Sequence, residues 1–206
     1  MQGLLAVNAA TVHDVFAVLA LVALGGAVLM IVARLAPVTA AYQFRHHLHR
    51  VQLPLAALVA TTTTLGSLWF SESAGWVPCR FCWFQRIFMY SAAVVLLVAA
   101  FRRDRSVKWY VVPLAGIGLL LSAWHMLIEH RIVEESASCS SVTSCANAYV
   151  VSFGRLEFDQ VTGEFVRSGF PVTLAVMAFS AFAAIITLLL IPESLDDVDA
   201  DTPVTN

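Results

Sequence analysis

Five runs of apolar residues in this chain approach the length that is needed to cross a lipid bilayer. They lie at about Val15–Ala36, Val51–Phe70, Trp83–Phe101, Trp109–Ile128 and Phe170–Ile191. A transmembrane helix needs about 20 mostly apolar residues. The chain is also 59% hydrophobic and 13% charged, whereas a soluble domain is about half apolar and a quarter charged. The sequence therefore predicts an all-α integral membrane protein with five spans.

The first run lacks the features of a cleavable signal. Residues 1–10 contain no Lys or Arg, and the apolar run that follows is longer than that of a signal peptide. We therefore expect Val15–Ala36 to be retained as a span. The net charge of −2 gives no indication of nucleic-acid binding.

Basic residues are unevenly distributed over the predicted loops. The first and third loops are short and basic, and their cationic residues are Arg34, Arg45, Arg50, Arg102, Arg103, Arg105 and Lys108. Because loops rich in Lys and Arg stay in the cytoplasm, we expect the N-terminus outside and the C-terminus inside. The acidic tail 193–206 has no Lys or Arg and is expected to be disordered.

The four cysteines all fall on one side of the membrane in this topology. Cys79 and Cys82 precede the third span, and Cys139 and Cys145 lie in the long loop before the fifth. Their side is extracytoplasmic, where disulfides form and persist. We therefore predict a multi-pass protein of the plasma (inner) membrane with its active cysteines facing outward.

The first cysteine pair is a Cys-x-x-Cys at a predicted helix N-terminus, directly after Pro78. Free N–H groups and the helix dipole at such a position stabilise a thiolate. Arg86 follows Cys82 by four residues, so it shares that helix face and is expected to favour the Cys82 thiolate. A purely structural disulfide is the alternative interpretation of this pair.

Two groupings resemble metal sites by composition. Cys79 and Cys82 could be half of a zinc site, but the Cys139-x5-Cys145 pair lacks the spacing of a second half. The other grouping is His46, His47 and His49, which we interpret as part of a solvated basic loop. No metal is expected.

Serines surround the second cysteine pair, so Cys139 and Cys145 are expected in a polar, mobile loop with an exposed bridge. Exposed bridges tend to be labile and catalytic. We therefore predict a relay, in which this outer pair exchanges with a soluble protein and the Cys79–Cys82 pair with an acceptor in the membrane. A lipid-soluble quinone is an acceptor of sufficiently high potential.

Four further side chains are candidates for the quinone site. Arg86 could hold a quinone carbonyl, although it could also extend to the interface, and Gln85 could be a donor or a helix-packing amide. His125 and His130 lie at the outer end of the fourth span, where one of them could bind the quinone or accept its proton. The alternatives are a hydrogen bond from His125 to a neighbouring helix and simple solvation of His130.

Two stretches of sequence resemble the DsbB family of disulfide bond formation proteins. They are Gly66–Glu72 and Pro78–Tyr90, and the second carries the specific run P-C-x-x-C-W-[YF]-Q-R-I-x-M-Y. The chain is most similar to the BdbC-type branch, whose loop pair is also Cys-x5-Cys. The resemblance extends from about Val51 to the end of the fifth span.

This resemblance implies a four-helix membrane bundle with two functional cysteine pairs. Cys79 and Cys82 would react with ubiquinone or menaquinone, with Cys82 facing the ring. Cys139 and Cys145 would exchange with a soluble, DsbA-like oxidase of the thioredoxin fold, and Arg86 would be the quinone-site arginine. Residues His125 and His130 both lie near positions where members of the family carry a histidine.

The chain departs from the family pattern in two places. Residues 1–50 would add an N-terminal helix and a basic cytoplasmic loop to the core at 51–192. Within the redox loop 129–169, apolar residues flank Thr162-Gly163, which suggests a small hairpin. Pro171 is expected in the first turn of the last helix.

Two rival functions differ in testable features. A vitamin K epoxide reductase-like enzyme has its loop cysteines before its Cys-x-x-Cys, whereas here Cys79 and Cys82 come first. A non-catalytic protein with two structural bridges would have disulfide potentials below about −300 mV. The order of the cysteines therefore favours the DsbB-type interpretation.

Overall fold

The apolar runs form four long helices and one shorter helix in a computed structural model of the chain. It describes residues 9–35, 39–134, 144–145, 156–158, 165–167 and 172–191. The helices are α1 (Ala9–Leu35), α2 (Thr39–Glu72), α3 (Arg80–Arg102), α4 (Lys108–Glu129) and α5 (Leu174–Leu189). A 3-10 turn, η1 (Arg105–Val107), precedes α4, and two short strands, β1 (Leu156–Phe158) and β2 (Phe165–Arg167), precede α5. The predicted all-α membrane architecture with an additional N-terminal helix is confirmed.

Four helical segments of the described residues are long and apolar enough to cross a membrane, so the protein is multi-pass. These segments are Thr11–Leu35, Leu48–Glu72, Arg80–Arg102 and Arg105–Glu129. Helix α5 has 16 residues and is shorter than the predicted fifth span. It begins later because the Thr173 hydroxyl accepts the N–H of Val176 at 3.2 Å and caps the helix. Pro171, which was predicted in the first turn of this helix, lies outside the described residues.

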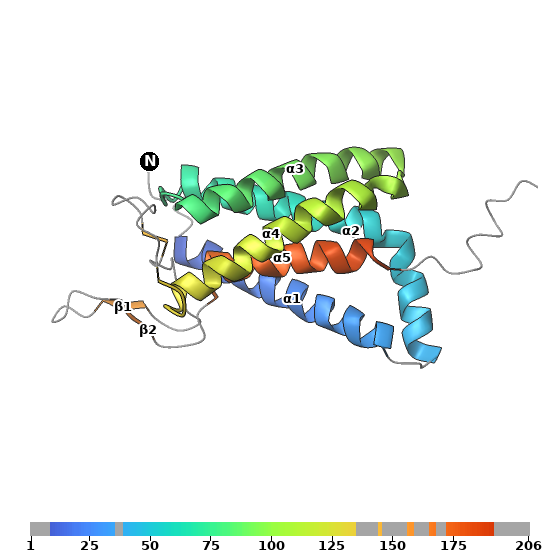
Figure 1. The fold of residues 1–206 in the computed structure, drawn as a ribbon, viewed down its shortest axis with the longest axis horizontal. Coiled ribbons are helices and arrows are strands. Elements are labelled where there is room, and N and C mark those ends of the chain that lie inside the picture. Colours follow the sequence, from blue (N-terminus) through green and yellow to red (C-terminus); the bar gives the residue numbers. More distant parts are fainter. Residues whose placement is uncertain are drawn as a thin grey trace, which may run out of the picture.

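Residues 39–50, predicted to be part of a basic loop, belong to helix α2. This stretch contains no Gly or Pro, whereas Pro37 lies where a helix continuing from α1 would be interrupted. The prediction of a solvated loop is also wrong for His49, which is 1% exposed. Pro54 lies inside α2, and Figure 1 shows α2 bent in this region, as the missing N–H of a proline explains.

The turn between α3 and α4 is closed by local hydrogen bonds. Arg103 ends α3 in the left-handed conformation, with φ of 56°, a position that stops a helix. The Asp104 carboxylate then caps η1 by accepting the backbone N–H of Ser106 at 2.9 Å. Hydrogen bonds from the Ser106 hydroxyl and N–H lower the pKa of Asp104. The cap therefore stays ionised, and the basic residues Arg102 to Lys108 are held at this end of the bundle.

Helices α2, α3, α4 and α5 pack around a common core whose innermost side chains include Leu96, Val111, Phe182 and Ile185. Helix α1 lies along α5 and meets α2 near one end of the bundle (Figure 1). Many apolar side chains of α1 point outward, with Val22 66% exposed. An outer surface of this kind is expected of a helix that faces lipid.

The start of α3, the end of α4 and the start of α5 gather at one end of the bundle, which we call the cysteine end (Figure 1). The α3–α4 turn lies at the opposite end. Cys79, Cys82 and Cys145 are therefore separated from the clustered basic residues of the α3–α4 turn by the length of the bundle.

The predicted hairpin is confirmed, because β1 and β2 pair antiparallel with Glu157 opposite Val166.

Helix α1 is fixed to α2 by an aromatic ring that lies on a glycine. A Cβ added to Gly66 would overlap the ring of Phe16, and Phe16 also packs against Phe70 with ring centroids 5.8 Å apart. We expect Gly66→Ala to destabilise the protein by about 1–3 kcal/mol, because α1 must shift to make room. Thermal unfolding in detergent measures this loss.

Gly26→Ala is the matched control, since nothing lies within 4 Å of a Cβ added at Gly26. This substitution should be neutral or stabilising by up to about 1 kcal/mol, because alanine favours a helix interior. Equal unfolding temperatures for the two variants would contradict the docking of Phe16 on Gly66.

Candidate redox site

Cys79 is the residue that begins helix α3. Its backbone is extended, with φ of −70° and ψ of 173°, and its sulfur accepts the backbone N–H of Cys82 at 3.2 Å. Pro78 precedes it and restricts the chain at the point of entry. The sulfur that accepts this free N–H of the first helical turn is therefore that of Cys79.

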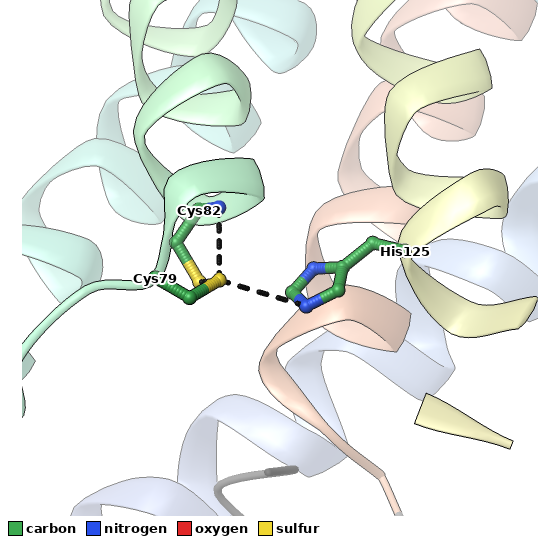
Figure 2. A group of neighbouring side chains, drawn as sticks. All are labelled: Cys79, Cys82 and His125. Atoms are coloured by element: carbon green, nitrogen blue, oxygen red, sulfur yellow. Dashed lines mark hydrogen bonds between the residues drawn. The ribbon is translucent and has the colours of Figure 1, made fainter. Parts of the chain in front are cut away.

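The two sulfurs of the Cys-x-x-Cys face each other. Their Sγ atoms lie 2.7 Å apart, and Figure 2 shows Cys79 between Cys82 and the His125 ring that projects from α4. The Nε2 atom of His125 lies 3.6 Å from the Cys79 sulfur. A reduced pair in this arrangement can share one proton between two sulfurs and has a proton-holding group at its side.

Gln85 orients the His125 ring. When the Gln85 amide donates to Nδ1, at 3.2 Å, the proton of a neutral ring lies on Nε2. That N–H then points toward the backbone carbonyl of Cys145, 3.2 Å away, and toward Cys79. The structure thus shows Gln85 packed against His125, which makes it both a helix-packing amide and a positioning group for the site.

Sequence reasoning missed Glu129. This side chain is 7% exposed, and its Oε1 atom lies 3.8 Å from Nε2 of His125. Its other oxygen accepts the Thr173 hydroxyl at 2.7 Å, which joins the ends of α4 and α5. The signal was available, because His125 and Glu129 are four residues apart and so share a helix face.

Cys145 lies in the same cluster as the first cysteine pair. It is fully buried and packs with Cys79 and Ile128. The prediction of an exposed loop bridge is therefore wrong for Cys145, because packing against α3 and α4 overrides the polar composition of the surrounding sequence. Cys139, the other member of the predicted pair, lies outside the described residues.

A cavity of about 320 Å³ opens beside Cys82. Helices α1, α2, α3 and α5 form its walls. Its polar lining lies mainly toward the cysteine end and includes Ser67, Cys82, Gln85, Arg86 and Tyr90. Most of the remaining lining is aliphatic or aromatic. A volume in the range of ligand pockets, apolar walls and a few grouped polar side chains are typical of a site for a small amphipathic molecule.

Arg86 is held at the wall of this cavity by helix α2. Its Nε donates to the Ser67 hydroxyl at 3.0 Å and one terminal nitrogen to the Ser67 carbonyl at 2.9 Å. The Tyr90 hydroxyl also contacts the Ser67 hydroxyl, at 3.3 Å, and the guanidinium lies over the Trp83 ring. The charge is thus fixed in place one helical turn from Cys82.

The structure separates the two candidate histidines. His125 is 3% exposed and belongs to the cluster, whereas His130 is exposed and follows the last residue of α4. The described residues bring His125, Gln85, Arg86, Cys79, Cys82 and Cys145 together and leave His130 apart.

Three possible metal ligands also meet at this point. One ligand atom each from Cys79, Cys82 and His125 lies within 4.8 Å of the others. A structural zinc site needs four protein ligands. Within the described part of the chain, this trio is one ligand short of a structural zinc site, while its thiol pair and histidine suit thiol–disulfide exchange.

Removing the Gln85 amide tests how much this side chain contributes to the stability of the protein. We expect Gln85→Leu to destabilise the protein by about 1–3 kcal/mol, because Nδ1 of His125 would be left buried and unpaired. Chemical denaturation or thermal unfolding in detergent gives this value.

Gln52→Leu is the matched control, because Gln52 is 7% exposed and its Oε1 has no hydrogen-bond partner among the described residues. That change should be neutral or stabilising. If Gln85→Leu were as harmless as Gln52→Leu, the amide would contribute nothing to the cluster.

A family model and individual known proteins both match this chain to proteins of disulfide bond formation. Residues 49–191 match the family described as "Disulfide bond formation protein DsbB". The chain is 38% identical over 143 residues to a "Probable disulfide formation protein" of Deinococcus radiodurans, which covers 68% of this chain and 88% of that protein. It is 41% identical over 99 residues to "Disulfide bond formation protein C" of Bacillus subtilis, covering 47% and 71% of the two chains. No solved structure shows significant similarity to the chain.

Proposed function

Because the chain belongs to the DsbB family of disulfide bond formation proteins, we propose that it reoxidises a soluble, DsbA-like oxidase of the thioredoxin fold and transfers the electrons to a membrane quinone. Family membership itself assigns a role in disulfide formation and a thiol oxidoreductase activity. The observation that supports the finer proposal is the position of the Cys79–Cys82 pair. Cys82 lines the ligand cavity, and Cys79 packs against Cys145 on its other side.

The first step is exchange with the soluble partner. A thiolate of the reduced partner attacks a disulfide between Cys139 and Cys145 and forms a mixed disulfide. The partner's second thiol then displaces the loop cysteine. The partner leaves oxidised, and Cys139 and Cys145 each carry a thiol.

The second step transfers the same two electrons from the loop cysteines to the Cys79–Cys82 pair. A thiolate of the loop pair attacks the Cys79–Cys82 disulfide, and the loop pair closes again as that disulfide opens. The packing of Cys145 against Cys79 supports this exchange between the two pairs. The Nε2–H of His125 lies 3.6 Å from the Cys79 sulfur and can donate a hydrogen bond to the Cys79 thiolate. The nearby Glu129 carboxylate can stabilise a protonated ring.

The last step regenerates the disulfide at the cavity. A quinone bound in the cavity would supply the oxidant, because its reduction to a quinol takes up two electrons and two protons. The cavity suits such a group, because Arg86 supplies a donor for a carbonyl oxygen where the Cys82 sulfur meets an apolar space. Arg86, fixed by Ser67, would bind a carbonyl and stabilise negative charge that develops on it. Cys79 and Cys82 return to the disulfide.

We propose that the cysteine end faces the extracytoplasmic side of the plasma membrane. The cationic residues Arg102, Arg103, Arg105 and Lys108 lie at the opposite end, and basic loops stay in the cytoplasm. This orientation gives the loop cysteines access to a soluble partner in an oxidising compartment.

Quinone-reduction kinetics with a reduced thioredoxin-fold oxidase as donor test the proposal. Under anaerobic conditions, the purified protein should consume one quinone for each disulfide formed in the donor. Oxidised donor and omission of the protein are the controls. Oxidation of the donor without quinone consumption, or no oxidation at all, would contradict the proposal.

A further inference from the structure

The ligand cavity has one wall that the family match does not include. Residues 49–191 match the family, yet helix α1, which ends at Leu35, contributes Phe16, Leu19, Ala20, Val22 and Ala23 to the lining. We propose that α1 builds a channel for the isoprenoid tail of the quinone. This inference rests on the proposed function and adds a role for the N-terminal helix.

The cavity is longer than a quinone ring requires. Its lining along α2 extends from Phe70 near the cysteine end to Leu58, which is about 18 Å along a helix axis. The polar residues Ser67, Cys82 and Arg86 lie in the part nearer the cysteine end. A ring bound beside Cys82 therefore leaves the deeper part of the cavity for another portion of the same molecule.

The deeper part has the character that a hydrocarbon tail requires. From α1 it is lined by Leu19, Val22 and Ala23, and from α2 by Leu58 and Val59. The side chains of Leu19, Val22 and Leu58 are also exposed, so this part of the cavity is open to the surrounding lipid. Thr63 donates its hydroxyl to the Val59 carbonyl at 2.8 Å, so this hydroxyl is satisfied within its own helix. Such walls offer dispersion contacts without demanding hydrogen bonds.

Small residues keep this space open. On α1 the lining includes Ala20 and Ala23, and on α5 it includes Ala178 and Ala181. A larger side chain at Ala23 would fill part of the channel. The position of α1 is fixed nearer the cysteine end, where Phe16 lies on Gly66 and Ala17 packs in a cluster with Val176. The wall is therefore held in place by contacts that lie nearer the cysteine end than the proposed tail channel.

The test compares quinones that share a ring but differ in the tail. For the wild type and for Ala23→Phe, kcat/KM is measured with 2,3-dimethoxy-5-methyl-1,4-benzoquinone and with the same ring carrying a decyl tail. We expect the ratio of the tailed to the ring-only value to fall about tenfold in Ala23→Phe, because the added phenyl ring occupies the channel. Val18→Phe is the control, since Val18 lies on α1, is 44% exposed and does not line the cavity.

An unchanged ratio in Ala23→Phe, or an equal fall in Val18→Phe, would overturn the inference. Failure of the wild type to reduce either quinone would instead contradict the proposed function. The two failures are therefore distinguishable.

Photolabelling supplies a readout that needs no variant and no turnover. A quinone with a diazirine at the end of its decyl tail should label the wild-type protein between residues 19 and 23 or near Leu58. Excess unmodified tailed quinone should prevent this labelling, whereas excess phospholipid should not. Labelling that persists under excess quinone, or that phospholipid removes, would indicate a lipid chain in the channel and overturn the inference.

Discussion

Replacing Cys82 by Ser should lower quinone reduction by about a thousandfold or more, with the fold retained. A hydroxyl cannot form the disulfide that must open and close in each cycle, and loss of a nucleophile typically costs orders of magnitude in rate. Cys82 is the cysteine that lines the ligand cavity, so its loss removes the proposed exit for the electrons. Quinone absorbance with a reduced thioredoxin-fold donor measures the effect.

The intermediate that accumulates should identify the order of the two pairs. In Cys82→Ser, Cys79 remains beside Cys145, so a disulfide between Cys79 and a loop cysteine should be trapped and detected by peptide mass spectrometry. Cys79→Ser should also stop turnover but without that species. If Cys82→Ser reduced quinone at the wild-type rate and only lowered the unfolding temperature, the Cys79–Cys82 bridge would be structural.

Much of the fold could be predicted from local sequence. The long apolar runs determine the helices of the bundle, because only a helix satisfies its own backbone in lipid. The wrong predictions concern helix boundaries, where two features of the local sequence favour different structures. The stretch 39–50 is basic and was interpreted as a loop, yet it contains no residue that breaks a helix, and α2 includes it. The last helix was predicted too long because the cap at Thr173 determines its start.

From the sequence we could predict those residues of the candidate site that lie on one face of a single helix. Cys82, Gln85 and Arg86 are spaced so that they approach one another on α3, and all three line the cavity. The residues Gly66 and Ser67 were visible only as part of a resemblance. Their physical roles, a surface for Phe16 and an acceptor for Arg86, depend on how α1 and α3 pack against α2.

Contacts between distant segments lay beyond the sequence. Nothing local indicates that Cys145 is buried against Cys79, because serine-rich sequence normally lies at the surface. The sequence of helix α1 is likewise an apolar run, and it does not indicate which helices α1 packs against. Only the packing of α1 against α2 and α5 places Leu19 and Ala23 in the wall of the cavity. The proposed role of α1 thus comes from tertiary structure alone.

Gly118→Ala should destabilise the protein by about 3 kcal/mol, the largest loss that we expect from a single added methyl group. Gly118 is buried in α4, and a Cβ there would overlap the ring of Phe182. Phe182 is fully buried in the core of the four-helix bundle, and a displaced ring would enter the ligand cavity that it also lines. Overpacking typically costs about 1–3 kcal/mol, and the overlap of a rigid ring with a helix backbone should lie at the upper end. Thermal unfolding in detergent measures the loss.

Gly116→Ala is the matched control on the same helix, because nothing lies within 4 Å of a Cβ added there. It should be neutral or stabilising by up to about 1 kcal/mol, since alanine is favoured over glycine in a helix. A second variant tests the cause: Phe182→Leu should cost stability alone but relieve part of the loss in Gly118→Ala, giving a non-additive cycle. Additive losses would mean that the ring and the glycine do not interact. Because Phe182 also lines the ligand cavity, Gly118→Ala should weaken quinone binding as well as the fold. Gly116→Ala should weaken neither.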